Sequence, residues 1–184
     1  MFERVRNEMG KIKLPEKAKL FFAIMYADDG IYKSALKDLN EKFGEIDKES
    51  KAFEFNMTGY YEGEMGRGLL KRFVTAKDLI DKERLAEIKN LTNSIEESYA
   101  RENRNRTINI DPGYITSSKL VLATTKNYSH RIYLRDGIFA EVTFNFRKNS
   151  IEFNPWTYSD YKLSVTTEFF IETHRKYMEA LKGN

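Results

Sequence analysis

The apolar run at residues 17–26, KAKLFFAIMY, constrains the fold of this chain more than any other segment. Residues 20–25 within it are all apolar, so an extended backbone would present apolar side chains to both faces of a sheet. Such a strand is stable only when both of its faces are covered. The sequence therefore predicts a central strand at residues 17–26, with a neighbouring strand on each side and with Phe21 and Phe22 largely buried.

Helical and extended patterns alternate in the segments that follow. The expected elements are, in chain order, a helix at residues 31–43, strands at 52–57 and 69–75, a helix from residue 81 and a strand at 107–110. Asp29 is placed to cap the first helix, and Gly44 is placed to end it. The order strand, helix, strand, strand, helix, strand is that of the ferredoxin-like split βαβ sandwich. We therefore expect an α+β protein with a ferredoxin-like core.

The turn sequence Asp136-Gly137 is the clearest local signal in the second half of the chain. It predicts a two-residue hairpin turn between strands at residues 129–135 and 138–146. A short third strand is expected after the turn at Lys148-Asn149, and a C-terminal helix at residues 165–181. The run at 117–126 is too short for its periodicity to distinguish a helix from a strand. The second half therefore adds a β-hairpin and a C-terminal helix to the core.

The size and composition of the chain fit one domain. Its 184 residues, of which 41% are hydrophobic, lie in the range of single domains, and no linker-like segment divides them. Residues 1–16 are rich in charge and are expected to be flexible or peripheral. No apolar stretch of signal-peptide length precedes residue 20, so we expect a cytoplasmic protein with no membrane partner. The absence of glutamine, with many Lys and Glu residues, favours a thermophilic source.

Several site chemistries are excluded by residue counts. The chain has no cysteine, which excludes disulfides, thiolate metal sites and cysteine nucleophiles. Its two histidines, His130 and His174, are too few for a histidine-rich metal centre. The 31 basic and 28 acidic residues are interleaved, whereas nucleic-acid-binding proteins concentrate basic residues on one face. A nucleic-acid partner is therefore less expected than a small anionic ligand.

The glycine-rich segment GEMGRGLLK, residues 63–71, resembles part of a phosphate-binding P-loop. Gly63 and Gly68 have the required gap, but Leu69 and Leu70 stand where a P-loop has lysine and a hydroxyl residue. The side chains that reach the terminal phosphates and magnesium are therefore missing, and we predict no P-loop-type GTP binding. A flexible turn is the first interpretation of this segment, and a backbone anion nest is the alternative.

A histidine and a glutamate in the predicted hairpin are candidate catalytic residues. A regular register with Tyr133 opposite Ala140 places His130 diagonal to Glu141 on one face. A carboxylate beside an imidazole orients it and raises its pKa, which suits general base catalysis. Pairing within the sheet is the structural alternative. Alternation along a regular strand places the next residue, Arg131, on the opposite face.

Asp111 is a third candidate catalytic residue. It ends the strand expected at residues 107–110, where Pro112-Gly113 predict a turn, and carboxylates at strand ends are common in active sites. Capping of that turn is the alternative interpretation. Together with Glu62 or Glu64, Asp111 would provide oxygen ligands for a divalent metal ion. We expect Asp111, His130, Arg131 and Glu141 to lie near one cleft.

Several of these segments resemble the domain-of-unknown-function 4416 family of prokaryotic proteins. The segments that carry the resemblance are YYEGEMGRGLLKRF (60–73), LIDKERLAEIKNLTN (79–93), INIDPGYIT (108–116), KLVLATTKNYSHRIYLRDGIFAEV (119–142) and PWTYSDY (155–161). Members of this family often carry the description of GTP-binding proteins. The polar and aromatic positions within these segments are Glu62, Glu64, Asp111, Tyr114, Lys119, Lys126, His130, Arg131, Tyr133, Glu141, Trp156 and Asp160.

Three functions are compatible with these residues. The leading hypothesis is binding, with or without turnover, of a small anionic ligand such as a nucleotide or a phosphorylated metabolite. Its candidate ligand-binding residues are Lys119, Lys126, Arg131, Tyr133, Trp156 and Tyr114. The second is an RNA-binding module in which Arg131, Tyr133 and Arg135 form one sheet face. The third is a structural or assembly protein without a ligand of its own.

Overall fold

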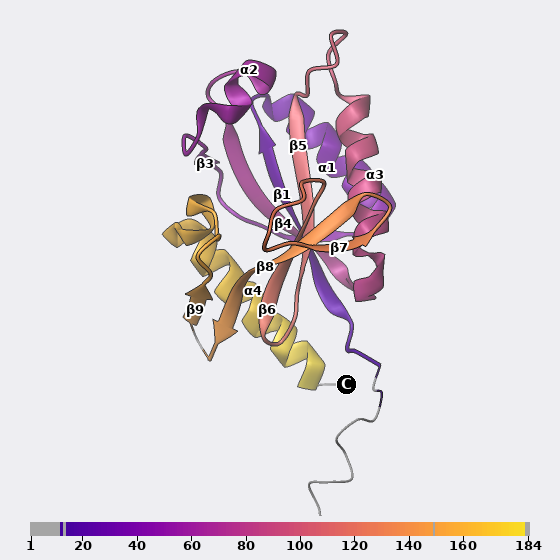
Figure 1. Cartoon of the computed structure of the whole chain (residues 1–184), viewed down its shortest axis with the longest axis vertical. Helices are drawn as coiled ribbons and strands as arrows, with labels where there is room; N and C mark the ends of the chain where they lie inside the picture. The colour runs from indigo at the N-terminus through magenta and orange to yellow at the C-terminus, as the bar shows by residue number, and fades with distance from the viewer. Residues whose placement is uncertain (1–11, 13, 149, 183–184) are drawn as a thin grey trace, which may run out of the picture.

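The computed structural model describes residues 12, 14–148 and 150–182 (Figure 1). In this part of the chain there are four α-helices and one open, nine-stranded antiparallel sheet, ordered β2-β4-β1-β5-β6-β8-β7, with β3 beside β4 and β9 beside β8. The strands are β1 (Ala18–Tyr26), β2 (Ile46–Glu49), β3 (Phe53–Glu54), β4 (Leu70–Ile80), β5 (Ile108–Ile115), β6 (Lys119–Thr124), β7 (Ile132–Arg135), β8 (Ile138–Arg147) and β9 (Ser150–Phe153). The α-helices are α1 (Asp29–Phe43), α2 (Glu62–Met65), α3 (Leu85–Ser98) and α4 (Ser164–Lys182), and the short 3-10 helices are η1 (Gly59–Tyr61), η2 (Lys82–Arg84) and η3 (Ser159–Lys162).

The apolar run forms the central strand β1, as its sequence predicts. All nine of its residues are buried, and β4 and β5 pair with it on either side. Phe21 and Phe22 are both fully buried, because successive side chains point to opposite faces of the sheet. The core therefore has two layers, one on each face of β1.

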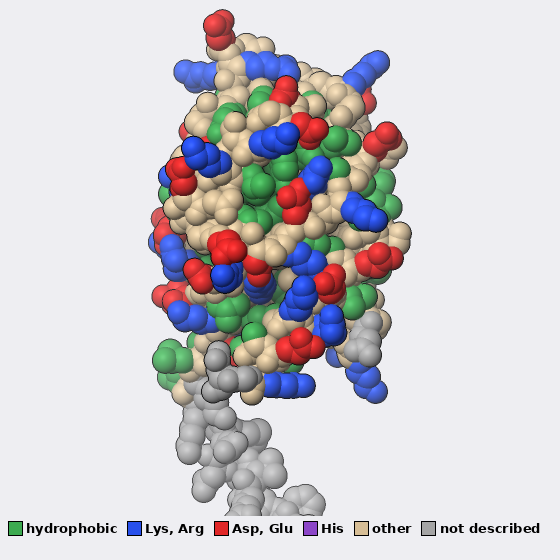
Figure 2. All heavy atoms as spheres, turned by 180° about the vertical axis from the view of Figure 1, so that it is seen from behind, with side chains coloured by type: hydrophobic (Ala, Val, Ile, Leu, Met, Phe, Trp, Pro, Cys, Tyr) green, Lys and Arg blue, Asp and Glu red, His purple; other side chains and the backbone are tan. Residues whose placement is uncertain are grey.

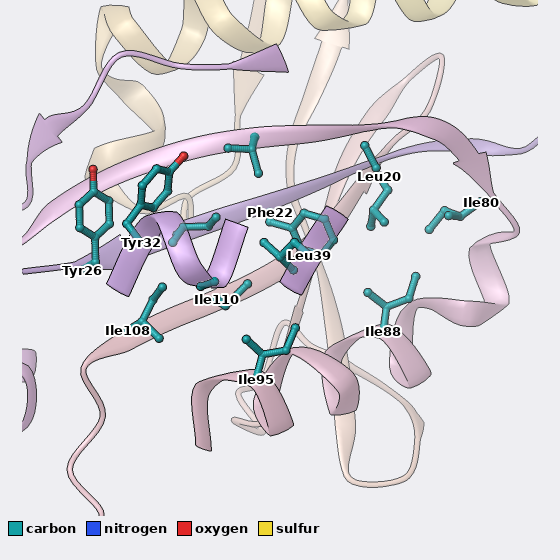
Figure 3. Close-up of a cluster of buried hydrophobic side chains, with 14 residues drawn as sticks. Leu20, Phe22, Tyr26, Tyr32, Leu39, Ile80, Ile88, Ile95, Ile108 and Ile110 are labelled. Atoms are coloured by element: carbon teal, nitrogen blue, oxygen red, sulfur yellow. The ribbon is translucent and has the colours of Figure 1, made fainter. Parts of the chain in front are cut away.

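Helices α1 and α3 cover one face of β1, and α4 covers the other. Leu20, Phe22 and Ile24 pack with side chains of α1, α3 and β5 (Figure 3). On the opposite face, Phe21 packs edge-on against Phe170 of α4, with ring centroids 5.2 Å apart. Fully burying a side chain of this size contributes roughly 1.5–3 kcal/mol. The alternation within one strand thus fixes which side of the sheet each helix occupies.

The sequence predicts Asp29 as the N-cap of α1, but the N-cap is Asp28. Its side-chain oxygen Oδ1 accepts hydrogen bonds from the amides of Gly30 (2.6 Å) and Ile31 (3.0 Å). Asp28 has the extended backbone that an N-cap requires, whereas Asp29 is already helical. The helix ends at Gly44, where φ is +84°, as expected.

The edge of the sheet beside β4 differs from the strand expected at residues 52–57. Two short strands, β2 and β3, occupy this edge, and both pair with β4. The four residues of β2, Ile-Asp-Lys-Glu, carry no apolar alternation, which is why the sequence pattern misses them. The ambiguous run at 117–126 contains a strand, β6, that is buried between β5 and β8.

The hairpin turn at Asp136-Gly137 is confirmed, but the register beyond it is not. Both turn residues have positive φ angles (53° and 77°), and Arg135 pairs with Ile138 as predicted. An irregularity at Leu134 then shifts the pairing, so Tyr133 lies opposite Phe139 and not Ala140. The strand begins at Ile132, so the preceding residues lie in a turn and are free of strand alternation. In the second predicted turn, Asn149 lies outside the described residues.

Strand β5 does not turn at Pro112-Gly113 but continues through both residues to Ile115. Its pairing with β6, however, ends at Gly113 opposite Leu122. The backbone groups of Pro112 point away from β1 and toward β6. The next residue pair between β5 and β6 would therefore need an N–H from Pro112, and proline has none. Pro112 therefore marks the place where β5 and β6 part, and the sheet opens there.

Gly113 is the last paired residue before this opening, and it has no room for a side chain. A Cβ built there would lie 2.4 Å from the Phe21 ring and 2.4 Å from the carbonyl oxygen of Val121. We expect Gly113→Ala to lower the free energy of unfolding by about 3 kcal/mol, measured by urea denaturation. Gly63→Ala is the control, because no atom lies within 4 Å of a Cβ there. Equal stability of the two variants would contradict the close packing described.

Candidate functional site

A cavity of about 630 Å³ lies beside the opening between β5 and β6. Its lining residues come from six segments that are distant in sequence. They lie within residues 55–61, 71, 89–93, 106–111, 122–128 with Arg131, and 158–161, which precede α4. The sheet provides the floor, and the segments before α2 and α4 provide the walls. Because these segments meet only in the folded chain, the cavity depends on the tertiary structure.

Side chains of α3 close the opening in the sheet. The amide of Ile110 donates to Glu96 Oε1 at 2.7 Å, and the carbonyl oxygen of Ile110 accepts from Lys89 Nζ at 3.0 Å. These two backbone groups face away from β1, where a neighbouring strand would otherwise pair with them. Buried backbone groups without a partner are costly, so Lys89 and Glu96 take the place of the missing strand.

Lys89 also forms an ion pair at the cavity wall. Its Nζ lies 2.8 Å from Asp111 Oδ1 and 3.5 Å from Glu96 Oε1, and its side chain is only 4% exposed. Burial alone lowers the pKa of Lys89, but the charges of Asp111 and Glu96 outweigh burial and raise it. Burial opposes ionisation of Asp111, but Lys89 lowers the pKa of Asp111 on balance. Burial dominates at Glu96 and raises its pKa.

A second buried ion pair joins β4 to the segment before α4. Lys71 Nζ lies 2.5 Å from Asp160 Oδ2, and both side chains are largely buried. The ammonium is also 5.1 Å from the centroid of the Tyr161 ring and 5.4 Å from that of Phe55. Cations over aromatic faces are stabilised electrostatically. This pair anchors η3 against the sheet.

Glu141 of β8 holds both Arg131 and His130. Its Oε2 atom accepts from Arg131 Nε at 2.7 Å and lies 3.0 Å from His130 Nε2. The two neighbours share this carboxylate because both precede β7. His130 lies in a turn, and the amide of Arg131 closes that turn by donating to the carbonyl oxygen of Tyr128 at 2.9 Å. The opposite faces expected from strand alternation do not apply. The His130 ring stacks on Trp156, with centroids 5.0 Å apart and an interplanar angle of 15°.

The guanidinium of Arg131 joins several elements at the cavity wall. Beyond Glu141, it donates to the Tyr158 hydroxyl at 2.9 Å and to the carbonyl oxygen of Lys126 at 3.0 Å. It also lies over the Tyr128 ring, 4.4 Å from the centroid. Burial alone would lower the pKa of Arg131, but Glu141 outweighs burial and raises it. Arg131 therefore stays charged and is held in one orientation.

The structure pairs Glu62 and Glu64, the expected metal ligands, with arginines. Glu64 accepts from Arg106 at 2.7 Å, and this hydrogen bond lowers the pKa of Glu64. Glu62 pairs with Arg67 at 3.3 Å. Within the described ranges, no group of three or more Asp, Glu or His side chains is placed to hold a metal ion. Each glutamate is paired with an arginine, and neither joins Asp111.

Positive side chains dominate the cavity lining. The lining cations are Lys71, Lys89, Arg106, Lys126 and Arg131, whereas the lining carboxylates are Asp111 and Asp160. The other carboxylates that hold these cations, Glu64, Glu96 and Glu141, are not part of the lining. Lys126 has no carboxylate at ion-pair distance among the described residues, and its Nζ lies 4.2 Å from the centroid of the Tyr60 ring.

The structure brings only some of the predicted site residues to the cavity. Asp111, Lys126 and Arg131 line it, and His130 and Glu141 lie behind Arg131. Four predicted ligand-binding residues lie elsewhere, namely Lys119, Tyr114, Tyr133 and Trp156.

The position of each of these four residues in the fold explains why it does not line the cavity. Lys119 begins β6, and the cavity lies near the end of that strand. Tyr114 packs on the side of the sheet that α1 and α3 cover. Tyr133 lies on the edge strand against Phe139, and Trp156 donates from Nε1 to the carbonyl oxygen of Val142.

Lys89 and Asn109 line the cavity but are not among the site residues predicted from the sequence. Lys89 follows the buried Leu85 by four residues, and Glu96 follows Lys89 by seven, so both charges fall on the buried face of α3. That placement is a signal, since lysine and glutamate are almost never fully buried unless paired. Asn109 carries no comparable signal. It accepts from Arg106 and donates to Asp111, which links the two ends of the lining.

The fold and the site define an α+β protein whose single antiparallel sheet opens onto a cation-lined cavity. Residues 16–177 match the family described as "Domain of unknown function (DUF4416)", and the chain belongs to this family. Neither the curated proteins nor the solved structures include a significant match to the chain. None of the helices in the described part of the chain is long and apolar enough to cross a membrane.

Replacing Lys89 tests whether its ion pair replaces the missing strand. We expect Lys89→Met to lower the free energy of unfolding by about 3–5 kcal/mol, because it leaves Asp111 without its ion-pair partner and the buried Glu96 with Arg106 alone. Burial already raises the pKa of Glu96, and without Lys89 fewer groups oppose burial at Glu96 and at Asp111, so we expect folding of the variant to favour protonated carboxyls. Stability then falls as pH rises, and the loss relative to the native chain is larger at pH 8 than at pH 5.

Urea denaturation at both pH values measures this effect. Lys37→Met is the matched control, because the Lys37 side chain is 79% exposed and its pair with Glu41 is long at 3.9 Å. We expect it to change stability by less than about 0.5 kcal/mol. The double variant K89M/D111N should recover part of the loss. A loss that does not vary with pH would contradict the role of the buried charges.

Proposed function

We propose that this chain binds a small anionic ligand in the cavity beside β5 and β6. The observation that carries the proposal is the lining, in which lysines and arginines face the cavity while three of their carboxylate partners lie behind it. The volume of about 630 Å³ lies within the range of small-molecule sites. Cations held in place by partners bind an anion without a further ordering cost.

Glu141 and His130 enter this proposal as positioning residues. Glu141 orients the Arg131 guanidinium through a 2.7 Å hydrogen bond, and His130 contacts the same oxygen. Asp111 is the only one of the three candidate catalytic residues in the lining, and its ion pair with Lys89 favours the charged carboxylate. The arrangement supports ligand binding directly, and turnover would proceed through Asp111 and not through a His130–Glu141 dyad.

The observations favour this function over RNA binding. The sheet face proposed for RNA requires Arg131 to be exposed, but Arg131 is 8% exposed and is bound to Glu141. Figure 2 shows basic and acidic side chains interspersed over the face opposite to that of Figure 1. RNA-binding surfaces instead gather positive charge along the path of the backbone.

We also propose that β1, α1, β2, β4, α3 and β5 form a ferredoxin-like unit. Its support is the strand order β2-β4-β1-β5, which is antiparallel throughout, with α1 and α3 packed on one face. Strands β6 to β9 and α4 would then be additions to that unit. The cavity would lie at the junction between the unit and its additions, because β5 and β6 part there.

Lys126 provides the direct test of the binding function. We expect a panel of inorganic phosphate, ribose 5-phosphate, nucleotides and small carboxylates to include a compound that raises the melting temperature, because specific binding stabilises the folded state. Lys126→Ala should remove most of this shift. Lys119→Ala is the matched control, since it removes the same charge from the other end of β6. Absence of any shift across the panel, or equal loss in both variants, would contradict the proposal.

A further inference from the structure

We propose that the ligand of the anion site is a nucleoside monophosphate, which has one phosphate and one planar aromatic base. This inference rests on the proposed function. Two properties define such a ligand, its charge and its aromatic ring. The charges of the lining limit the first, and the tyrosines at the cavity indicate the second.

The ion pairs of the lining limit the charge of the ligand. Lys71, Lys89, Arg106 and Arg131 each already face a carboxylate within 2.5–2.8 Å. Lys126 alone among the five lining cations has no such partner within the described residues. Lys126 and the N–H groups of the paired cations that face the cavity accommodate a monophosphate. A triphosphate would bring several more negative charges against Asp111 and Asp160 without compensation.

Exposed tyrosines indicate the aromatic part of the ligand. Tyr60, Tyr128 and Tyr158 line the cavity, and they are 65%, 51% and 45% exposed. Tyr60 and Tyr128 each contact a cation, Lys126 and Arg131, through their ring faces. Stacking of a base on such rings is typical of nucleotide recognition. The aromatic rings thus lie beside the cations that would hold the phosphate.

A buried hydroxyl without a partner points to a polar contact with the ligand. Tyr161 lines the cavity and is 1% exposed, and its hydroxyl has no hydrogen-bond partner among the described residues. Burial, reinforced by Asp160, Asp111 and Glu141, raises the pKa of Tyr161 well above its usual value. The hydroxyl therefore keeps its proton and serves as a donor. Buried polar groups are normally satisfied, but this oxygen is closed to solvent in the free protein, so we infer that a ligand oxygen becomes its acceptor only when neighbouring side chains move aside.

Isothermal titration of the full chain with AMP, GMP, ribose 5-phosphate, adenosine and GTP tests the inference. We expect at least one of AMP and GMP to bind tenfold or more tightly than ribose 5-phosphate, adenosine and GTP with or without magnesium. Tyr128→Leu should weaken the preferred monophosphate at least fivefold and leave ribose 5-phosphate within twofold. Tyr133→Leu, an exposed tyrosine outside the cavity, is the control and should change neither.

Tyr161→Phe should weaken the preferred monophosphate about tenfold without lowering the melting temperature of the free protein. Equal binding of ribose 5-phosphate and the nucleotides would overturn the inference and leave the anion site intact. Tighter binding of GTP than of GMP would overturn the charge argument. If none of the five compounds binds and the wider anion panel also fails, the proposed function itself falls.

Discussion

The contact between α3 and the free side of β5 is the interaction on which the rest of the structure depends. Pro112 has no N–H, so β6 cannot continue its pairing past Gly113. The backbone groups of Ile110 would then be buried without partners, but Lys89 and Glu96 bind them. The sheet can therefore open without losing these hydrogen bonds, and the opening provides space for the cavity.

Helix α3 therefore has two structural roles, because it covers the core and also binds the backbone of β5. Its apolar side chains Ile88 and Ile95 pack on β1, as Figure 3 shows, while Lys89 and Glu96 on the neighbouring part of the helix reach β5. Buried ion pairs are weak contributors to stability, because desolvation offsets much of their attraction. Their greater effect here is positional, since each fixed cation has a single orientation toward the cavity.

Local signals explain what the sequence predicts correctly. The apolar run of β1, the apolar spacing of α1 and the Asp136-Gly137 turn each act within a few residues, so each is visible in the chain alone. Non-local effects explain the failures. Pro112 is typical of a turn, yet it lies within β5. It can do so because the pairing of β5 with β1 does not need an N–H from Pro112. The cavity could not be predicted, because its lining comes from separate segments that only the folded sheet brings together.

Stability and the proposed ligand binding would be coupled at this site, because the same side chains hold the fold together and line the cavity. Lys71 anchors the segment before α4, Lys89 replaces a strand, and Arg131 ties the turn before β7 to β8. Each also lines the cavity. Removing one of them therefore loses structure along with charge, and a loss of binding at these positions would not identify a ligand contact. Lys126 differs, because its ammonium has no carboxylate partner among the described residues and rests only on the exposed Tyr60 ring. It is the lining cation whose charge the fold needs least, and its removal is therefore the most direct test of the proposed anion site.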